Sequence, residues 1–377
     1  MSHPKKDSLG IIGWDTFDFF VNDLDRSLQF YTESFGLPLM ARSSERHSAE
    51  SGENTLLFGK NGIAMACIAP TERDSRADRY LRRHPDGIGV VGLRVRNLEH
   101  ARQLLAQRGA TFATGVQHSL DYAGQPYGWF EITTPLGEVR YRFVERQLES
   151  LPPGLVPLDS PQGDIQAYQH IDHVTANMLT LQPYIHWLRD VMGFEEYWRV
   201  EFHTSDAKGD EGSGLASIVM YDPESKIKMA NNEPAIPNFE GSQVYTFVED
   251  NNGPGVQHVA FHVPDIQETV DTLQRRGLNF LEVPDTYYEM LPQRLKEHRV
   301  TNFTENIERL RELGVLVDGE DGKYLLQLFM KEGALLYDDA KAGPFFYEMI
   351  QRKGATLFGE GNFRALFESI ERDQLAR

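Results

Sequence analysis

Cysteine is almost absent from this chain of 377 residues, which contains a single one, Cys67. One cysteine excludes an intramolecular disulfide and suits a reducing compartment. No apolar run approaches the roughly 20 residues that a membrane-spanning helix needs, and the first residues lack the apolar core of a signal peptide. We therefore expect a soluble, cytoplasmic protein.

Positive charge is also scarce, since 38 lysines and arginines stand against 56 aspartates and glutamates, which gives a formal net charge of −18. This balance argues against nucleic acid or an anionic membrane as the main partner, because both are polyanions. An apolar content of 40% over this length can fill the cores of two domains of ordinary size.

The sequence does contain an internal repeat. Segment 87–95, GIGVVGLRV, matches segment 255–263, GVQHVAFHV, and the match continues without a gap to Gln-Arg-Gly at 107–109 and Arg-Arg-Gly at 275–277. Self-similarity at a fixed offset indicates a duplicated unit. Each copy alternates strand and helix patterns, which predicts an α+β fold in which paired βαβββ units form half-open barrels.

The two copies define the predicted domains. We expect a first domain over residues 1–150, a linker over 151–168 that is rich in proline, glycine and aspartate, and a second domain over 169–377. The strands that carry the repeat lie inside these two domains, so each domain should hold one pair of βαβββ units.

Three segments of the second copy have no counterpart in the first. Insertions at about 283–320 and at 331–343 interrupt the repeat. We expect the second insertion to project outward, or else to alter the rim of a pocket or an oligomer contact. A final helix at about 363–374 has an apolar stripe on one face, which is typical of a helix that docks on a core.

The copies differ at three matched positions in residue types that bind metals. The first copy has Thr16, Val90 and Arg142, whereas the second has His173, His258 and Glu348. Two histidines and one carboxylate on separate strands are the ligands of a facial non-haem Fe(II) site, which leaves positions open for substrate and O2. Since a valine occupies one of the matched positions, packing alone does not require a histidine there.

Other metals and other histidines fit less well. A catalytic zinc site keeps one open position beside a base, and the chain has no HExxH. His262 shares a strand face with His258 but lies about 13 Å farther along. His170 precedes His173 by three residues, which predicts the opposite face of its strand. We therefore predict one Fe(II) per chain, bound by the two matched histidines and Glu348.

Several strings in the second copy carry a family resemblance. They are Gly255 to His258, Pro284 to Leu291, Leu325 to Phe329, Phe345 to Gly354, and the C-terminal block from Phe358 to Glu371. Together with the paired units, they make the chain similar to the 4-hydroxyphenylpyruvate dioxygenase family of the vicinal oxygen chelate superfamily. The resemblance is dense in the second half, highly specific in the C-terminal block, and holds only in outline in the first half.

This resemblance implies roles for individual residues. The metal ligands that it implies are His173, His258 and Glu348. The residues that it implies for catalysis are Asn232, Gln243 and Gln257. The substrate pocket would be lined by uncharged polar side chains and two phenylalanines, namely Ser217, Asn232, Gln243, Gln257, Gln327, Phe329, Asn362 and Phe363. The last helix would close this pocket as a lid.

Each of these roles has a structural alternative. Phe329 and Phe363 are as easily core residues as pocket walls, and Gln243 could cap a turn. Gln257, next to His258 on a strand, should point away from the metal and could act through that ligand. The apolar stripe of the last helix is what any docked helix shows.

The resemblance also implies a reaction. The enzyme would convert 4-hydroxyphenylpyruvate and O2 to homogentisate and CO2 in the breakdown of tyrosine and phenylalanine, as a homo-oligomer of two or four chains. The nearest rival is 4-hydroxymandelate synthase, which uses the same substrate and metal, but Asn232 and the Gly361-Asn362-Phe363 block favour ring hydroxylation. More distant alternatives are an extradiol catechol dioxygenase and a metal-free small-molecule binding protein of the same fold.

Overall fold

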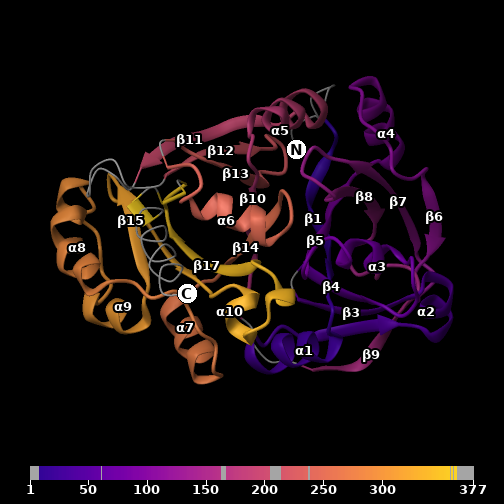
Figure 1. Cartoon of the computed structure of the whole chain (residues 1–377), viewed down its shortest axis with the longest axis horizontal. Helices are drawn as coiled ribbons and strands as arrows, with labels where there is room; N and C mark the ends of the chain where they lie inside the picture. Colours follow the sequence, from indigo (N-terminus) through magenta and orange to yellow (C-terminus); the bar gives the residue numbers. More distant parts are fainter. Residues whose placement is uncertain are drawn as a thin grey trace.

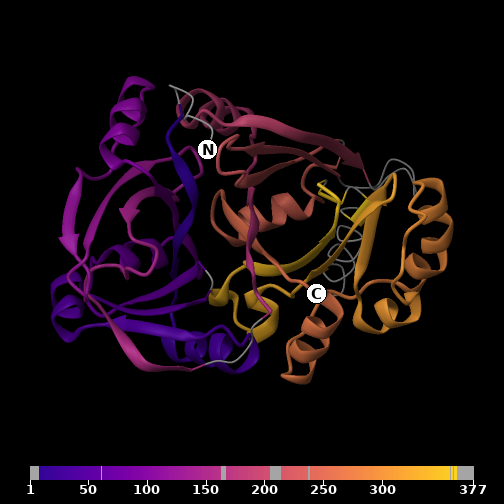
Figure 2. The same cartoon turned by 180° about the vertical axis from the view of Figure 1, so that it is seen from behind.

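The computed structural model of the chain describes residues 8–60, 62–162, 167–203, 214–236, 238–356, 358–359 and 361–362. Two curved sheets lie side by side, an indigo-to-magenta one from the first half and a rose-to-yellow one from the second (Figure 1, and from behind in Figure 2). Within these ranges, no helix has the length and apolar character that crossing a membrane requires.

The first sheet has nine strands in the order β6-β7-β8-β5-β1-β4-β3-β2-β9. Its first unit contains β1 (Ile11–Phe20), α1 (Leu24–Gln29), the π-helical turn η1 (Phe30–Ser34), β2 (Leu39–Ser43), α2 (Glu45–Ser51), β3 (Glu53–Lys60), β4 (Ile63–Pro70) and α3 (Arg76–Leu81). Its second unit contains β5 (Gly87–Val95), α4 (Leu98–Gln107), β6 (Gln117–Leu120), β7 (Pro126–Thr133) and β8 (Arg140–Arg146), and β9 (Leu155–Gln162) follows.

The second sheet has eight strands in the order β11-β12-β13-β10-β14-β17-β16-β15. Its first unit contains β10 (His170–Asn177), α5 (Gln182–Trp187), the π-helical turn η2 (Leu188–Met192), β11 (Glu195–His203), β12 (Gly214–Tyr221), β13 (Lys228–Pro234) and α6 (Gln243–Asp250). Its second unit contains β14 (Gly255–His262), α7 (Ile266–Arg275), α8 (Asp285–Glu297), α9 (Ile307–Leu313), β15 (Leu316–Glu320), β16 (Lys323–Phe329), α10 (Gly333–Tyr337), the 3-10 turn η4 (Ala340–Ala342) and β17 (Phe346–Lys353).

The two strand orders follow one plan. In the first sheet β1 is parallel to β4 and antiparallel to β5, and in the second β10 is parallel to β13 and antiparallel to β14. Each sheet is therefore a pair of βαβββ units joined at their first strands, and the predicted fold class is confirmed.

Local signals repeat as well. The helices after β5 and β14 begin at Asn97 and Asp265, whose side chains each accept a hydrogen bond from the backbone N–H three residues later. They are followed by Gly109 and Gly277, with φ of 83° and 85°, a backbone conformation that glycine adopts without strain. Both helices thus start and stop for the same physical reasons.

The structure adds detail that the sequence did not predict. Part of the predicted linker, Leu155–Gln162, forms β9 and pairs with β2 at the edge of the first sheet. The division into domains stays a prediction. Three short helices, α2, α3 and α6, were also missed, because segments of six to eight residues give little periodicity.

Both predicted insertions need correction. Residues 316–320 form β15, a strand of the repeated unit that pairs with β16, so the first insertion ends before them. The segment 331–343 does not project outward. Asp339 pairs with Arg26 of the first half at 2.8 Å, and the carbonyl of Lys341 accepts a hydrogen bond from the Asp86 backbone N–H at 2.8 Å. This segment therefore joins the two halves.

Aromatic side chains fill the boundary between the halves. The ring of Phe35 lies 4.8 Å from Tyr168, 5.5 Å from Phe261 and 4.9 Å from Tyr347. A hydrogen bond between the hydroxyls of Tyr31 and Tyr347 crosses the same boundary. Since all of these side chains are buried, the two sheets share one continuous core.

Phe363 and the predicted helix at 363–374 lie outside the described residues. Their proposed roles as pocket wall and lid stay predictions.

Candidate metal centre

The three predicted metal ligands meet on one face of the second sheet. His173, His258 and Glu348 come from β10, β14 and β17, and their ligand atoms all lie within 4.8 Å of one another. The register explains this, because Ala260 of β14 lies opposite His173 on one side and opposite Glu348 on the other. His258 is two residues from Ala260 and so projects from the same face.

The donor atoms converge on one point. The Nε2 atoms of His173 and His258 each lie 3.3 Å from Oε2 of Glu348. The three residues are 2%, 3% and 1% exposed, respectively. No fourth His, Cys, Asp or Glu joins this group in the described part of the chain. Two nitrogens and one carboxylate on one side of a shared point suit a divalent transition metal with open positions.

The outer nitrogen of each histidine has its own partner. Nδ1 of His173 lies 2.9 Å from Oδ1 of Asp172, and Nδ1 of His258 lies 3.1 Å from Oε1 of Gln257. Both partners are acceptors, so each Nδ1 carries the proton and each Nε2 presents a lone pair to the metal position. The rings are thereby oriented for metal binding.

Asp172 is itself held by Arg352. Two guanidinium nitrogens of Arg352 donate to the two Asp172 oxygens, both at 2.7 Å. Burial by itself would raise the pKa of Asp172, but the hydrogen bonds from Arg352 and His173 outweigh burial and keep this pKa well below its ordinary value. Asp172 therefore remains a carboxylate that can orient His173.

Glu348 is ionised in the same buried setting. Burial raises its pKa, but the two histidines lower the pKa further, to about 2. Burial lowers the pKa of His258; in His173 burial acts the same way, but Glu348 and Asp172 outweigh it and raise the pKa. A bound divalent cation requires both imidazoles in the neutral form. Gln327 Nε2 donates to Glu348 Oε1 at 2.9 Å, so the second oxygen of Glu348 remains directed at the histidines.

A chain of hydrogen bonds extends from Gln327 to the C-terminal segment. Asn362 Nδ2 donates to Gln327 Oε1 at 2.9 Å, and the Tyr287 hydroxyl lies 2.9 Å from Asn362 Oδ1. Gly359 has φ of +76°, and a Cβ on it would lie 2.3 Å from Gln327 Oε1. The predicted metal ligand Glu348 is therefore linked to α8 and to the segment that precedes the predicted last helix.

Aromatic rings pack around the ligands. Phe329 lies 6.2 Å from the His258 ring, and Phe346 stacks on His258 at 4.9 Å. Phe358 meets the His173 ring edge-on at 4.9 Å. These contacts exclude water from the histidines, and Phe329 lies where a wall of the predicted pocket would be.

A row of polar side chains on the same sheet face has unused hydrogen-bonding atoms. Ser217, Asn232 and Asn177 are opposite one another in register across β12, β13 and β10. Asn232 Nδ2 donates to Asn177 Oδ1 at 2.9 Å. The Ser217 hydroxyl, Asn232 Oδ1 and Asn177 Nδ2 are buried and have no hydrogen-bond partner in the described part of the chain. Each such atom costs about 1–3 kcal/mol, so this row is prepared for a polar ligand group.

Gln243 and Gln257 contact each other instead. Gln257 Nε2 donates to Gln243 Oε1 at 3.3 Å, while Gln257 Oε1 faces His258 Nδ1. Gln243 is the first residue of α6, after its cap Ser242. In this arrangement the two amides orient His258, and a direct contact of either with substrate stays a prediction.

The placement predicted for His170 is wrong. A bulge between Ile171 and His173 shifts the register, so that His170 lies opposite His262 and stacks on it at 4.7 Å. Residues opposite each other in a ladder share a face, and His262 shares the face of His258. His170 is therefore on the metal side of the sheet, but unlike the three buried predicted ligands it is exposed.

Several residues around the site were not identified from the sequence. The Asp172–Arg352 pair was visible in the repeat, because Asp15 and Arg146 are its counterparts and form the same ion pair at 2.8 Å. Asn177 gave no signal, since its role depends on the neighbouring strand.

Comparisons with known proteins identify the family of the chain. Residues 13–137 and 170–291 match the model of the Glyoxalase/Bleomycin resistance protein/Dioxygenase superfamily. The chain is 31% identical to 4-hydroxyphenylpyruvate dioxygenase of Dictyostelium discoideum, over 97% of this chain and 99% of that one. It is also 31% identical to the Danio rerio protein of the same name, over 95% and 90% of the two chains.

A solved structure supports the fold. A triple mutant of 4-hydroxymandelate synthase from Streptomyces coelicolor superimposes with a TM-score of 0.80 at 23% identity, covering 97% of this chain and 99% of that one. At this identity the likeness concerns architecture alone. The full-length matches near 31% carry the family assignment: the chain is a dioxygenase and belongs to the 4-hydroxyphenylpyruvate dioxygenase family of this superfamily.

Proposed function

We propose that this protein converts 4-hydroxyphenylpyruvate and O2 to homogentisate and CO2, using Fe(II) bound by His173, His258 and Glu348. The observation that carries the proposal is the convergence of these three buried donors in a chain that matches the dioxygenases over its full length. Fe(II) bound there would supply positions for the oxo-acid arm and for O2 and would pass electrons from the substrate to O2.

Charge balance favours a monoanionic substrate. One carboxylate and two neutral imidazoles leave a divalent cation with one positive charge in a buried site. The carboxylate of a 2-oxo acid neutralises that charge. In the balanced reaction one oxygen atom of O2 enters the new carboxylate and the other enters the ring, so no external reductant is consumed.

The polar row provides a place for the phenol. Asn232 Oδ1 can accept a hydrogen bond from the phenolic O–H, and Asn177 Nδ2 or the Ser217 hydroxyl can donate one to the phenolic oxygen. These groups are uncharged, so they can hold the ring without adding charge beside the metal. Phe329 and Phe346, which belong to the neighbouring strands β16 and β17, would pack against the ring of the substrate.

The remaining residues keep the ligands in position. Asp172 holds the proton on His173 Nδ1, Gln257 does so for His258, and Gln327 orients Glu348. A cytoplasmic location and a homo-oligomer of two or four chains remain further proposals.

A product assay tests the proposed function. The purified protein is incubated with Fe(II), ascorbate, air and 4-hydroxyphenylpyruvate, and the products are separated by liquid chromatography with mass detection. Homogentisate with an equal amount of CO2 supports the proposal. Formation of hydroxymandelate would support the metal site but contradict the proposed position of the ring. No turnover by iron-loaded protein would contradict the assignment of 4-hydroxyphenylpyruvate as the substrate.

A further inference from the structure

The first half contains a cavity of about 580 Å³. This volume lies within the range of roughly 300–1,000 Å³ that is usual for small-molecule sites. Residues of α2 and residues 152–155, which lead into β9, line one part of it, and strands of the first sheet line the rest. The cavity is separate from the metal centre, whose ligands all belong to the second sheet.

The strand register makes this cavity the counterpart of the proposed substrate pocket. Phe20, Thr55 and Ile68 lie opposite one another across β1, β3 and β4, as Asn177, Ser217 and Asn232 do in the second sheet. Every residue of that first-half row lines the cavity, and so do Thr16, Trp129 and Arg142, the counterparts of His173, Gln327 and Glu348. The duplication thus left an open space in the first half and replaced the residues around it.

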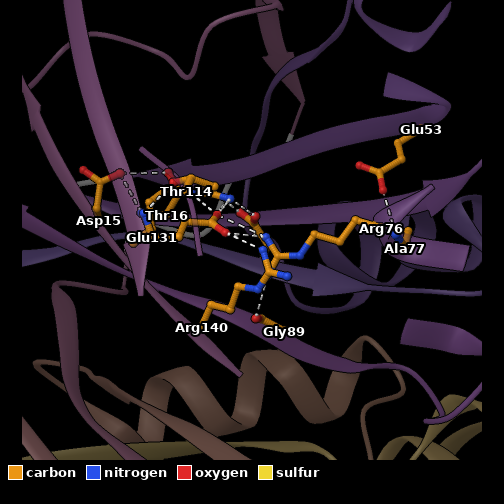
Figure 3. A network of polar contacts seen from close by, with 11 residues as sticks. Asp15, Thr16, Glu53, Arg76, Ala77, Gly89, Thr114, Glu131 and Arg140 are labelled. Atoms are coloured by element: carbon orange, nitrogen blue, oxygen red, sulfur yellow. Dashed lines mark hydrogen bonds and ion pairs between the residues drawn. The ribbon is translucent and has the colours of Figure 1, made fainter. Parts of the chain in front are cut away.

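A network of buried charges, part of which is shown in Figure 3, reaches the cavity through Asp18, Arg76 and Arg142, which line it. Arg142 pairs with Asp18 and Glu131, and Arg76 and Arg140 pair with the same Glu131. Two carboxylates therefore stand against three guanidinium groups. The carboxylates are 6% and 5% exposed, whereas Arg142 and Arg76 are 18% and 23% exposed, so the accessible part of the network is cationic.

Arg76 has donors to spare. Its Nη1 donates to both oxygens of Glu131, at 3.1 and 3.0 Å, and its Nη2 donates to the Gly89 carbonyl at 3.3 Å. A guanidinium has five N–H groups, so Nε and one Nη2 proton remain without a partner among the described residues. Arg142 differs, since its Nε, Nη1 and Nη2 atoms all bind Asp18 or Glu131.

The direction of the Arg76 pKa shift is consistent with these remaining N–H donors. Burial lowers the pKa of Arg76, and although Glu131 opposes that effect, Arg140 and Arg142 add to it and the pKa lies below its ordinary value. Its positive charge is therefore incompletely compensated. Glu53 also lines the cavity and accepts a hydrogen bond from the Ala77 backbone N–H at 2.6 Å; burial and Asp18 raise its pKa, while this hydrogen bond and the charge of Arg76 oppose the rise.

The walls suit a flat apolar group. The Arg76 guanidinium lies 5.4 Å from the centre of the Phe20 ring, and Tyr127 and Trp129 enter the cavity from β7, with their rings 5.8 Å apart. Ala66 and Ile68 add aliphatic surface. An aromatic body beside a carboxylate would therefore find both kinds of contact here.

We propose that this cavity is a second binding site, independent of the metal, for a small aryl carboxylate whose carboxylate binds Arg76 and whose ring packs against Phe20 and Trp129. The proposal does not depend on the reaction at the metal centre. Any compound of this chemistry qualifies, including acids that the proposed reaction consumes or forms.

The test uses the full chain with Glu348→Ala, which disables the metal site, and phenylacetate as the probe, since it lacks the oxo group that chelates a metal. Calorimetric titration should give one binding event per chain. The neutral isostere phenylacetamide should bind at least about tenfold more weakly, because it loses the charge-assisted hydrogen bonds to Arg76. Equal binding of the two probes would overturn the role of the carboxylate.

Two further variants in that background locate the site. Arg76→Gln should weaken phenylacetate binding at least about tenfold. Ala66→Phe, which narrows the cavity without changing a charge, should also weaken it. Arg82→Gln, an exposed arginine outside the cavity, is the matched control and should bind as before. Circular dichroism identifies folded variants, and unchanged binding in a folded Arg76→Gln or Ala66→Phe protein, or no binding to the parent, would overturn the proposal.

Discussion

The two halves of this chain share a scaffold but differ in what the scaffold holds. At three matched positions the second sheet has His173, His258 and Glu348, where the first has Thr16, Val90 and Arg142. Around these positions both sheets keep a bulge before the first ligand position and an aspartate–arginine pair beside it. The ion pair therefore serves the scaffold in both halves, and in the second half it also orients a ligand.

The comparison also shows how each half compensates buried charge. The second half gathers one carboxylate and two imidazoles, which a metal cation can neutralise. The first half has Arg142 in place of Glu348 and neutralises it with Asp18 and Glu131. One half thus depends on an external cation and the other on its own carboxylates, and mutations should separate the two cases.

The largest effect is expected for Glu348→Ala. Removing the only anionic ligand should abolish stable iron binding and lower turnover at least about a thousandfold. Iron content measured by mass spectrometry and homogentisate formation are the two readouts. A variant that keeps bound iron and normal turnover would remove Glu348 from the ligand set.

The matched change in the first half, Arg142→Ala, should act on stability instead. It leaves Asp18 and Glu131 short of a buried partner, which typically costs about 3–5 kcal/mol. Urea unfolding followed by circular dichroism measures this loss, and the iron content of the folded protein should not change. Arg140→Ala is the control, since Arg140 is more exposed and, among the described residues, pairs with Glu131 alone, so its loss should cost less. Equal losses in the two variants would contradict the assigned network.

Acid should weaken the first half through Glu131. Burial raises the pKa of Glu131, but the arginines Arg142 and Arg76 lower it further, to about 2 from 4.5. A depressed pKa stabilises the fold fully above the unfolded value, and this contribution is lost as the pH falls from about 4.5 toward 2. Over that window the loss should be on the order of 3 kcal/mol. In metal-free protein, Glu131→Gln should make the free energy of unfolding fall less steeply as the pH is lowered through this window. An unchanged pH dependence would refute this assignment.

A smaller effect is expected from the shared ion pair. Asp172→Asn should lower iron affinity by about 10–100-fold, because it disturbs the partner of His173 Nδ1. Asp15→Asn breaks the equivalent pair in the first half and should leave iron affinity unchanged. Competition with a chelator measures affinity, and circular dichroism confirms that both proteins are folded. Similar iron affinities in the two variants would mean that Asp172 only supports the fold.

Much of the fold could be predicted from the sequence because its signals are local or repeated. The helix caps at Asn97 and Asp265, the glycines that follow these helices, and the alternating strands all lie within short windows. The exchange of Thr16, Val90 and Arg142 for metal-binding residues needed only the alignment of the two copies.

Other features depended on neighbours far away in the sequence. The face of His170 was predicted wrongly because a bulge is set by the pairing of β10 with β14, which alternation within one strand does not reveal. The segment 331–343 binds the first half through Arg26 and Asp86, residues about 300 positions earlier, and no local pattern indicates such a partner.

The sequence by itself determined the duplication, the fold class and the three positions that could bind a metal, because each follows from periodicity or from comparing one copy with the other. Only the tertiary structure decided which atoms face one another: the partners of the histidine nitrogens, the atoms of Ser217, Asn232 and Asn177 that find no partner among the described residues, and the cavity lined by Arg76. These depend on strand register and side-chain packing between distant segments, where a shift of one residue would turn each side chain to the other face.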